Sequence, residues 1–398
     1  MSVEIMPDIF WIGVNDRTTD LFEGMWPIEQ GVSYNSYLIR DKKKVLVDLV
    51  KGNQLEEFLG KVEELIDPSE LDYAIINHME PDHSGILKAI RRCAPNVQLI
   101  GTKRMIPMVE AFYGITKGVV EVGDGSTLNL GKRTLEFFRT PFVHWPETMM
   151  TFERSNGTLF SCDGFGGFGA LRGAIFDDEV PDLEYYRQEA LRYYANIVAK
   201  FSQSVLGAIN KLSDLPIKVI APSHGVIWRN HPEDIIQLYQ QWAGYAKGSR
   251  EKAVTLVYGS MYGNTESIMN FVARGISREG VLVEIYDAAR MHSTYILASL
   301  WKNEGVLIGA PTYEVELFPP VAHVLDMARR KSIFGRKAGY FGSFGWGGGA
   351  KREFDKLAEA LKWEIVGEFV FKGGATRQEQ QLAEEFGKEF AQKILASE

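Results

Sequence analysis

From Glu251 onward the sequence alternates short apolar runs of β-type residues with amphipathic stretches, and this alternation constrains the fold more than any other feature. The predicted strands are residues 252–258, 281–286, 305–309, 338–342 and 364–371. The predicted helices are an amphipathic stretch ending at Arg278 and residues 294–301, 320–330, 351–363 and 379–396. Five such repeats form an open parallel sheet with helices on both faces. Ligands of doubly wound sheets bind beyond the carboxyl ends of the strands.

Three loops stand at those carboxyl ends. The first is rich in hydroxyl groups and glycine and leads into a helix, so its backbone N–H groups and the helix dipole can bind a phosphate. It contains no Lys or Arg and no Walker-type sequence, which indicates a monophosphate that is bound and not transferred. The candidate binding residues are Ser260, Met261, Tyr262, Gly263, Asn264, Thr265, Pro311, Thr312, Tyr313, Ser343, Phe344, Gly345, Trp346, Gly347 and Gly348.

The second and third loops add aromatic surface. Tyr313, Phe344 and Trp346 stand among glycines that let backbone N–H groups approach a flat ring. Ser260-Met261-Tyr262-Gly263-Asn264-Thr265, together with the repeats that follow it, resembles the phosphate loop and fold of flavodoxin. The resemblance implies FMN as the cofactor, with its ring against the three loops. A flavodoxin-like domain without flavin is the alternative.

A second cluster of chemistry lies in the amino-terminal half. His78-Met79-Glu80-Pro81-Asp82-His83 follows the mostly apolar run 71–76, so the motif is expected on a loop at a strand's carboxyl end. Pro81 is expected to prevent regular helix across the motif, with a helix starting after Ser84-Gly85. Three further candidates each stand beside a strand-like segment: His144, Asp163 and His224. Together these side chains are enough for two metal ions with one shared carboxylate.

The donor types narrow the choice of metal. Imidazoles mixed with several carboxylates suit iron or manganese at least as well as zinc. Cys162 adjoins Asp163, and strand alternation predicts that its side chain points to the opposite face, so it is left out of the ligand set. The glycine-rich run 164–169 matches a dinucleotide-binding pattern, but it follows Asp163 and opens no convincing helix, which favours a loop of the metal site.

His78, Glu80, Asp82 and His83, followed by His144, Asp163 and His224, resemble the metallo-β-lactamase-like domain of flavodiiron proteins. Zinc hydrolases of that fold carry a histidine where Glu80 stands. The resemblance implies one iron held by His78, Glu80 and His144, a second held by Asp82, His83 and His224, and Asp163 bridging them. It also implies an αββα sandwich over residues 1–249, followed by the flavodoxin-like doubly wound parallel sheet over residues 250–398, an α/β fold throughout.

The same resemblance implies reduction of O2 to water, of NO to N2O, or of both, with FMN relaying electrons to the two irons. It implies a head-to-tail homodimer or a higher oligomer, in which the flavin of one subunit faces the irons of the other. Cys93 and Cys162 are too few for a rubredoxin centre or a cysteine-ligated iron–sulfur cluster. An external donor is therefore expected, such as rubredoxin, a reduced deazaflavin or a flavin reductase.

Chain length, net charge and apolar runs bear on the number of domains, on nucleic-acid binding and on membrane association. A chain of 398 residues is too long for one ordinary core and fits two domains. A net charge of −8 argues against nucleic-acid binding, and a solvated face is expected for the basic run Arg329-Arg330-Lys331 with Arg336-Lys337. Apolar runs stay short of the roughly 18 residues that a membrane helix needs, and the amino terminus lacks the regions of a signal peptide. No membrane association and a cytoplasmic location are expected.

Two other hypotheses remain at this stage. One is a dinuclear zinc hydrolase fused to a flavin electron-transfer module, with a metal-bound hydroxide as nucleophile. The other is an electron carrier or redox sensor without catalysis. Trp145 and Trp346 could exclude water near the metals and the flavin, or serve as packing. Tyr193 and Tyr194 could donate to a metal-bound ligand, or be core aromatics. The sequence does not separate O2 from NO as the preferred substrate.

Overall fold

The structure is a computed structural model and describes residues 1–397. The chain divides into two compact units, Met1–Ala243 and Gly244 onward. The sequence predicts domains at residues 1–249 and 250–398. These exact bounds remain a prediction, and the two units meet six residues earlier. Each unit has its own sheets and its own buried core.

The first unit is built on two main sheets. The seven-stranded sheet has the order β1-β2-β7-β8-β9-β10-β11 and the five-stranded sheet the order β12-β13-β14-β15-β16. Their strands are β1 (Val3–Met6), β2 (Ile9–Trp11), β7 (Tyr37–Arg40), β8 (Lys44–Val47), β9 (Tyr73–Ile75), β10 (Gln98–Gly101), β11 (Val119–Glu121), β12 (Thr127–Asn129), β13 (Thr134–Arg139), β14 (Met149–Glu153), β15 (Thr158–Cys162) and β16 (Val219–Pro222). Two small ribbons pair β3 (Val14–Asp16) with β6 (Val32–Tyr34) and β4 (Leu21–Phe22) with β5 (Trp26–Pro27).

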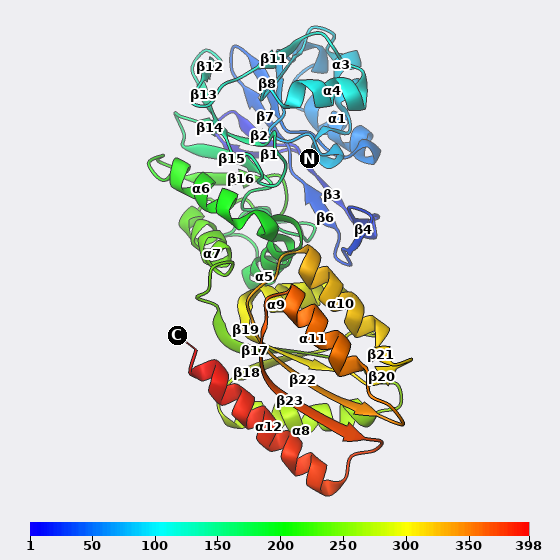
Figure 1. Ribbon diagram of the computed structural model, residues 1–398. Helices are drawn as coiled ribbons and strands as arrows, with labels where there is room; N and C mark the ends of the chain where they lie inside the picture. Colours follow the sequence, from blue (N-terminus) through cyan, green and yellow to red (C-terminus); the bar gives the residue numbers. More distant parts are fainter. Residues whose placement is uncertain (398) are drawn as a thin grey trace. The chain divides into compact units, whose positions relative to one another are not determined.

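Apolar side chains of both main sheets form one buried cluster. Ile39, Val47 and Ile75 come from the first sheet, and Phe137 and Phe160 come from the second. Helices lie beside each sheet, which completes the sandwich (Figure 1). The α-helices are α1 (Leu55–Glu63), α2 (Pro81–Ser84), α3 (Leu87–Cys93), α4 (Met105–Tyr113), α5 (Leu183–Tyr193), α6 (Ser202–Leu212) and α7 (Pro232–Gly244), and the short helical turns are η1 (Gly52–Gln54), η2 (Pro68–Glu70), the π-helical η3 (Tyr194–Val198) and η4 (Ala199–Phe201).

The second unit contains a five-stranded sheet in the order β18-β17-β19-β22-β23, and every pair in it is parallel. This is the order of flavodoxin-like sheets, whose direction of winding reverses between β17 and β19. The strands are β17 (Glu251–Tyr258), β18 (Leu282–Asp287), β19 (Asn303–Gly309), β22 (Lys337–Phe344) and β23 (Glu364–Lys372), with a small ribbon of β20 (Thr312–Tyr313) and β21 (Glu316–Leu317).

Helices cover both faces of this sheet. In Figure 1, α8 and α12 lie side by side on one face, while α9, α10 and α11 cover the other. Their bounds are α8 (Asn264–Arg278), α9 (Ser293–Lys302), α10 (Pro319–Arg330), α11 (Ala350–Ala360) and α12 (Arg377–Leu395). The predicted α/β fold class, a sandwich followed by a doubly wound parallel sheet, is confirmed.

Two local expectations were wrong. Pro81 does not prevent helix across the metal motif, because it is the first residue of α2, where the missing N–H of proline needs no partner. Arg336 does not belong to a solvated basic face, because only 2% of its surface is exposed. Its guanidinium donates to the carbonyl groups of Leu300 and Trp301 at the carboxyl end of α9, where a positive charge is favourable.

Across residues 1–397, every helix is too short or too polar to cross a membrane.

Candidate functional site

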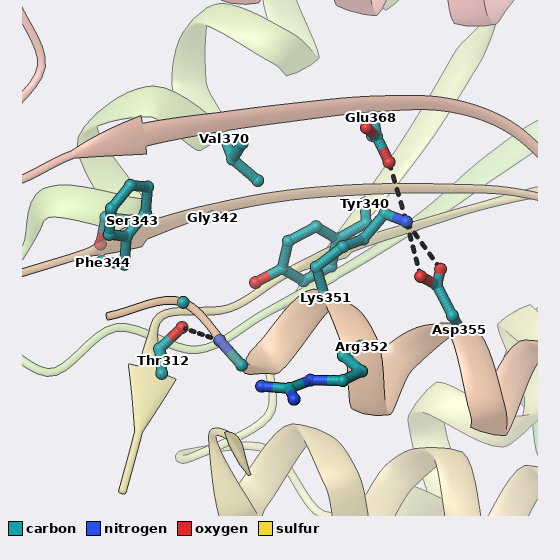
Figure 2. A pocket seen from close by; sticks show the side chains of 12 residues that line it. Thr312, Tyr340, Gly342, Ser343, Phe344, Lys351, Arg352, Asp355, Glu368 and Val370 are labelled. Carbon is teal, nitrogen blue, oxygen red and sulfur yellow. Dashed lines mark hydrogen bonds and ion pairs between the residues drawn. The ribbon is translucent and has the colours of Figure 1, made fainter. Parts of the chain in front are cut away.

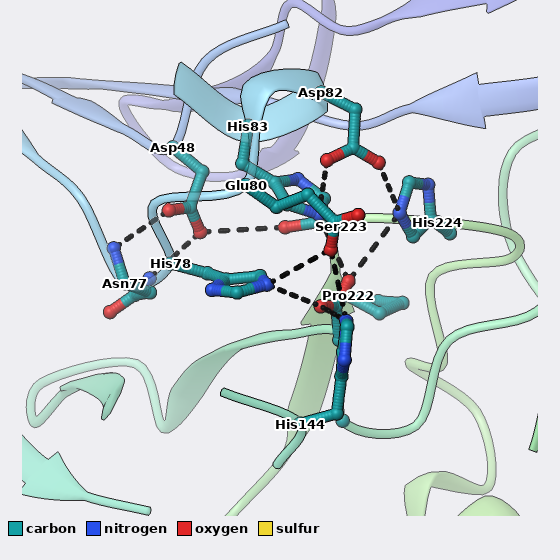
Figure 3. Close-up of polar contacts among 12 residues, drawn as sticks. Asp48, Asn77, His78, Glu80, Asp82, His83, His144, Pro222, Ser223 and His224 are labelled. Atoms are coloured by element: carbon teal, nitrogen blue, oxygen red, sulfur yellow. Dashed lines mark hydrogen bonds and ion pairs between the residues drawn. The ribbon is translucent and has the colours of Figure 1, made fainter. Parts of the chain in front are cut away.

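The predicted metal ligands converge in the first unit. Figure 3 shows the loop after β9, carrying His78, Glu80, Asp82 and His83, opposite the side chains of His144 and His224. Two groups of donor atoms result, His78 with Glu80, His144 and Asp163, and Asp82 with His83 and His224. Within each group the donor atoms lie within 4.8 Å of one another. All seven predicted ligand residues therefore belong to one cluster.

Asp163 stands between the two groups. Its Oδ2 lies 3.3 Å from Nε2 of His78 and 3.3 Å from Nε2 of His144. Its Oδ1 lies 3.0 Å from Nε2 of His83 and 3.4 Å from Nε2 of His224. One oxygen thus faces each pair of imidazoles, which is the geometry of a bridging carboxylate.

The other two carboxylates, Glu80 and Asp82, each lie close to the imidazoles of one group. Glu80 Oε2 lies 3.2 Å from His78 Nε2 and 3.0 Å from His144 Nε2. Asp82 directs Oδ1 to His83, at 3.4 Å from Nε2, and Oδ2 to His224, at 3.3 Å from Nε2. Each group therefore offers two imidazoles and one carboxylate of its own, together with one oxygen of Asp163.

Several of these atoms are buried without a hydrogen-bond partner among the described residues. They are both carboxylate oxygens of Asp82 and of Asp163, both ring nitrogens of His83, and Nε2 of His224. Buried polar atoms are normally paired, and leaving one unpaired costs about 1–3 kcal/mol. Lone pairs that converge without hydrogen bonds fit bound cations, so the donor set passes this test for two metal ions.

Negative charge within the cluster raises the pKa values of the imidazoles strongly. Burial alone would lower the pKa of His144 and of His224, but the close negative charges of Asp163 and of the second carboxylate of each group raise these pKa values to about 9 and about 10. Burial alone would raise the pKa of Asp163, and the neighbouring His83 together with the other imidazoles lowers it well below the usual range.

Metal uptake should therefore depend on pH. Metal binds the neutral imidazole, so at neutral pH it must displace protons from His144 and His224. Since the folded-state pKa values are raised, affinity is expected to increase with pH until about 9 to 10 and then level off. Titrating the metal-free protein with Co²⁺ between pH 6 and 10 checks this, and an affinity independent of pH over that range would contradict it.

Outer contacts fix the orientation of the ligands. His78 Nδ1 lies 2.7 Å from Oε1 of Glu147, and His224 Nδ1 lies 2.7 Å from the carbonyl oxygen of Ser33. The backbone N–H and side-chain amide of Asn77, the residue before His78, donate to Asp48. Glu147, Ser33 and Asp48 were not predicted from the sequence. No ligand-like motif marks them, although Glu147 follows His144 closely in the chain.

The side chain of Cys162 does not lie where the sequence predicts it. Its backbone φ of 51° interrupts the strand alternation at the end of β15. Its sulfur, the ring of His83 and the carboxylate of Asp163 have donor atoms within 4.8 Å of one another. The prediction that Cys162 points away from Asp163 was wrong, because alternation holds only while the backbone stays extended.

Aromatic side chains surround the His224 group. Phe22 lies edge-on to His224 at a centroid distance of 5.4 Å, and Tyr193 lies at 5.6 Å. Phe168, from the glycine-rich run 164–169, packs against Phe22 and Tyr193. Trp145 packs edge-on against His78 at 5.0 Å. Tyr194 lies further along, and its hydroxyl bonds to Ser202.

In the second unit, the three predicted binding loops meet at the carboxyl ends of β17, β19 and β22. Thr265 Oγ1 and Ser343 Oγ are 3.3 Å apart, so the first loop contacts the third. The backbone N–H of Gly349 donates to Thr312 Oγ1, so the second loop contacts the third as well. Gly263, with φ of 87°, is the residue before α8, and no side chain of residues 1–397 caps the backbone N–H groups of the first turn of this helix.

Exposed aromatic residues stand at these loops. Tyr262 is 90% exposed and Trp346 is 87% exposed, while Met261 and Tyr313 are about 40% exposed. Single exposed apolar residues are ordinary, but several gathered on adjoining loops mark a binding surface. The first and third loops therefore offer flat apolar surfaces beside hydroxyl groups.

A cavity of about 270 Å³ adjoins the third loop, between α11 and β23 (Figure 2). Thr312, Ser343, Phe344 and Gly348, four of the predicted binding residues, contribute to its lining. At its far end Lys351 forms ion pairs with Asp355 at 2.7 Å and with Glu368 at 2.8 Å.

The comparisons agree with both halves of the molecule. Residues 32–225 match the family model described as ODP family beta lactamase, and residues 256–387 match flavodoxin. An anaerobic nitric oxide reductase flavorubredoxin from Pectobacterium atrosepticum is 36% identical over 88% of this chain and 69% of its own length. The flavodiiron protein of Giardia intestinalis superposes with a TM-score of 0.94 at 29% identity, over 100% of this chain and 97% of that one. The rubredoxin:oxygen oxidoreductase of Desulfovibrio gigas gives 0.93 at 27% identity, over 100% of both chains.

A metallo-β-lactamase-like unit with a two-group ligand cluster, followed by a flavodoxin-like unit, defines a class of two-domain oxidoreductases. The chain belongs to the flavodiiron protein family.

Proposed function

We propose that this protein is an oxidoreductase that reduces O2 to water or NO to N2O at a diiron site, with electrons relayed through FMN. The observation that carries this proposal is the position of Asp163, whose two buried oxygens face two separate pairs of imidazoles without hydrogen bonds. A sequence relative named as a nitric oxide reductase and a solved structure named as a rubredoxin:oxygen oxidoreductase support it.

Iron is the metal that the flavodiiron relatives indicate, and the donor set suits it. His78, Glu80 and His144 would hold one ion, Asp82, His83 and His224 the other, and Asp163 both. When bound, the two irons supply electrons and open positions for a small oxidant. The protein's own part is to hold the ligands in buried, aromatic-lined surroundings, because excluding water strengthens every electrostatic interaction there.

FMN would occupy the three loops of the second unit. Ser260, Thr265 and the first backbone N–H groups of α8 would hold its phosphate. Tyr313, Phe344 and Trp346 would contact its ring, together with the backbone of 345–348. When bound, FMN accepts electron pairs and passes single electrons on.

Partners follow from this chemistry. The 398 residues contain two cysteines, too few for a rubredoxin centre among them, so we propose that a separate donor reduces the flavin, such as rubredoxin, a reduced deazaflavin or a flavin reductase. A head-to-tail homodimer, in which one subunit's flavin faces its partner's irons, stays a prediction, as does the cytoplasmic location. Light scattering at the assay concentration gives the mass of the active species. A monomer that turns over at the full rate would contradict the predicted dimer.

Tyr193 is positioned to act on a ligand at the cluster. Its ring is fully buried against His224, and its hydroxyl has no hydrogen-bond partner among residues 1–397. Burial, aided by the charges of Asp163 and Asp82, raises its pKa well above the usual value, so the hydroxyl keeps its proton and can donate it as a hydrogen bond.

Replacing Tyr193 with Phe should lower the rate of flavin reoxidation by O2 or NO about tenfold, the effect of one lost charge-assisted hydrogen bond of about 1.4 kcal/mol. Iron and FMN content should not change, since Tyr193 holds neither. Tyr186→Phe, on the same helix α5, is the control, because the hydroxyl of Tyr186 donates to the carbonyl group of Ala170, which is not a ligand residue. Equal rates in wild type and Tyr193→Phe would show that the hydroxyl of Tyr193 has no part in the reaction and that its ring only packs in the core.

Anaerobic stopped flow tests the proposed function directly. The iron- and FMN-loaded protein is fully reduced, mixed separately with O2 and with NO, and followed by flavin absorbance. Reoxidation far faster than that of free reduced FMN supports the diiron reductase, and the faster gas is then the substrate. A reoxidation rate equal to that of free reduced FMN would contradict the diiron reductase. If elemental analysis also finds stoichiometric zinc and the protein hydrolyses esters or lactams, the zinc hydrolase hypothesis is supported instead.

A further inference from the structure

The two metal-ligand groups are matched in their donors but not in what holds those donors. Each group offers two imidazoles, one carboxylate and one oxygen of Asp163. Apart from the sulfur of Cys162, which lies near the donor atoms of His83 and Asp163, the two metal positions differ in the residues behind the ligands. The clearest such residue is Glu147.

Glu147 is buried behind His78. Its side chain is 1% exposed, and its Oε1 lies 2.7 Å from His78 Nδ1. Since Nε2 of His78 faces Glu80 and Asp163, Nδ1 carries the proton and donates it to Glu147. The same oxygen accepts the backbone N–H of Met79 at 3.0 Å, so it fixes the loop as well as the ring.

The other group has no such contact. His224 donates from Nδ1 to the carbonyl oxygen of Ser33, a neutral acceptor. Nδ1 of His83 is buried and has no hydrogen-bond partner among the described residues. Within residues 1–397, only the His78 group thus has a carboxylate that is hydrogen-bonded to the outer nitrogen of an imidazole.

A carboxylate that accepts the outer proton of a ligating imidazole makes the inner nitrogen a stronger donor and fixes its tautomer. A neutral carbonyl does this more weakly, and an unpartnered nitrogen does not do it at all. The ring of His78 is further confined by Trp145, which packs edge-on against it. Both contacts reduce the reorganisation that metal binding would require of His78.

We propose that Glu147 is a positioning residue that makes the position of His78, Glu80 and His144 the tighter of the two metal positions, so that this position fills first. The inference rests on the proposed diiron function and concerns the order of metal loading. A chain with one metal ion therefore carries it on the His78 side of Asp163.

Glu147→Gln is the decisive variant. The glutamine side-chain oxygen can still accept from His78 Nδ1 and from Met79 N–H, so the substitution removes the charge and keeps the shape. Glu153→Gln is the matched control, because Glu153 is also fully buried and accepts the backbone N–H groups of Ser155 and Asn156 without touching any ligand.

The measurement is a Co²⁺ titration of the metal-free, full-length protein against a chelator, followed by visible absorption. Wild type is expected to bind in two steps. Glu147→Gln is expected to weaken the first step about 10- to 100-fold, the usual effect of losing such a partner, and so bring the two steps together. Glu153→Gln is expected to keep both steps. His144→Ala should remove the tight step, and His224→Ala should remove the weak one.

Other outcomes separate the two proposals. Two Co²⁺ ions bound with equal affinity in wild type, or two steps unchanged in Glu147→Gln, overturn the role of Glu147 while the diiron function stands. Loss of the weak step in His144→Ala overturns the assigned order. Equal weakening by Glu153→Gln shows a general effect of buried charge and overturns the inference. Failure of wild type to bind Co²⁺ overturns the metal site and the inference together.

Discussion

Replacing Asp163 with Ala is expected to abolish gas-dependent flavin reoxidation, leaving only the rate of free reduced FMN. Asp163 gives one oxygen to each pair of imidazoles. Its removal therefore weakens both metal positions together. The imidazole rings of His78 and His144, and of His83 and His224, would then face one another at centroid distances of 5.1 and 4.8 Å without the shared negative charge.

Two readouts distinguish this result from misfolding. Iron per chain should fall from two towards zero, while FMN content should stay at the wild-type value, because the flavin residues lie in the other unit. Asp177→Ala, which removes another buried aspartate of the first unit, should keep its iron, since Asp177 bonds only to the backbone of residues 229–231. Full iron content and near wild-type reoxidation in Asp163→Ala would contradict the bridging role.

The second large effect is expected from Gly349→Ala in the third flavin loop. A Cβ at Gly349 would lie 1.7 Å from the carbonyl oxygen of Val315 and 2.5 Å from its carbonyl carbon. Both neighbours are backbone atoms, so the third loop would have to move away from the second. The hydrogen bond from Gly349 N–H to Thr312 Oγ1 would be lost in that movement.

We expect Gly349→Ala to weaken FMN binding at least tenfold and to destabilise the flavin-free protein by about 1–3 kcal/mol, the usual cost of overpacking. Gly347→Ala, in the same loop, is the matched control for the stability effect alone, because no protein atom among the described residues lies within 4 Å of its added Cβ. Fluorescence titration with FMN and thermal unfolding measure the two effects. Equal unfolding temperatures for the two variants would show that the loop yields without strain.

Most of the metal cluster could be predicted because its residues, apart from His144 between the antiparallel strands β13 and β14, stand where parallel strands end. His78 to His83 follow β9 directly, Asp163 follows β15 and His224 follows β16. Strand ends are visible in the sequence as apolar runs that stop at polar residues. The parallel sheet of the second unit was visible in the same way, and its order 2-1-3-4-5 agrees with the predicted class.

What could not be predicted depends on contacts between distant segments or on single backbone angles. Glu147 reaches His78 across 69 positions of chain, and no local pattern marks the pair. Arg336 looked like part of a charged surface, but tertiary packing buries it against the end of α9. Cys162 follows no alternation because one φ angle turns positive at the strand's last residue.

The ligands also come from two different sheets. The motif after β9 belongs to the seven-stranded sheet, while Asp163 and His224 follow strands of the five-stranded sheet. Metal ions at this cluster would act as cross-links between the two layers of the sandwich. Loading then depends on folding: the first four ligands are local in the chain, but the others reach them only after the second sheet has docked. Both metal positions are thus complete only when the two layers have docked.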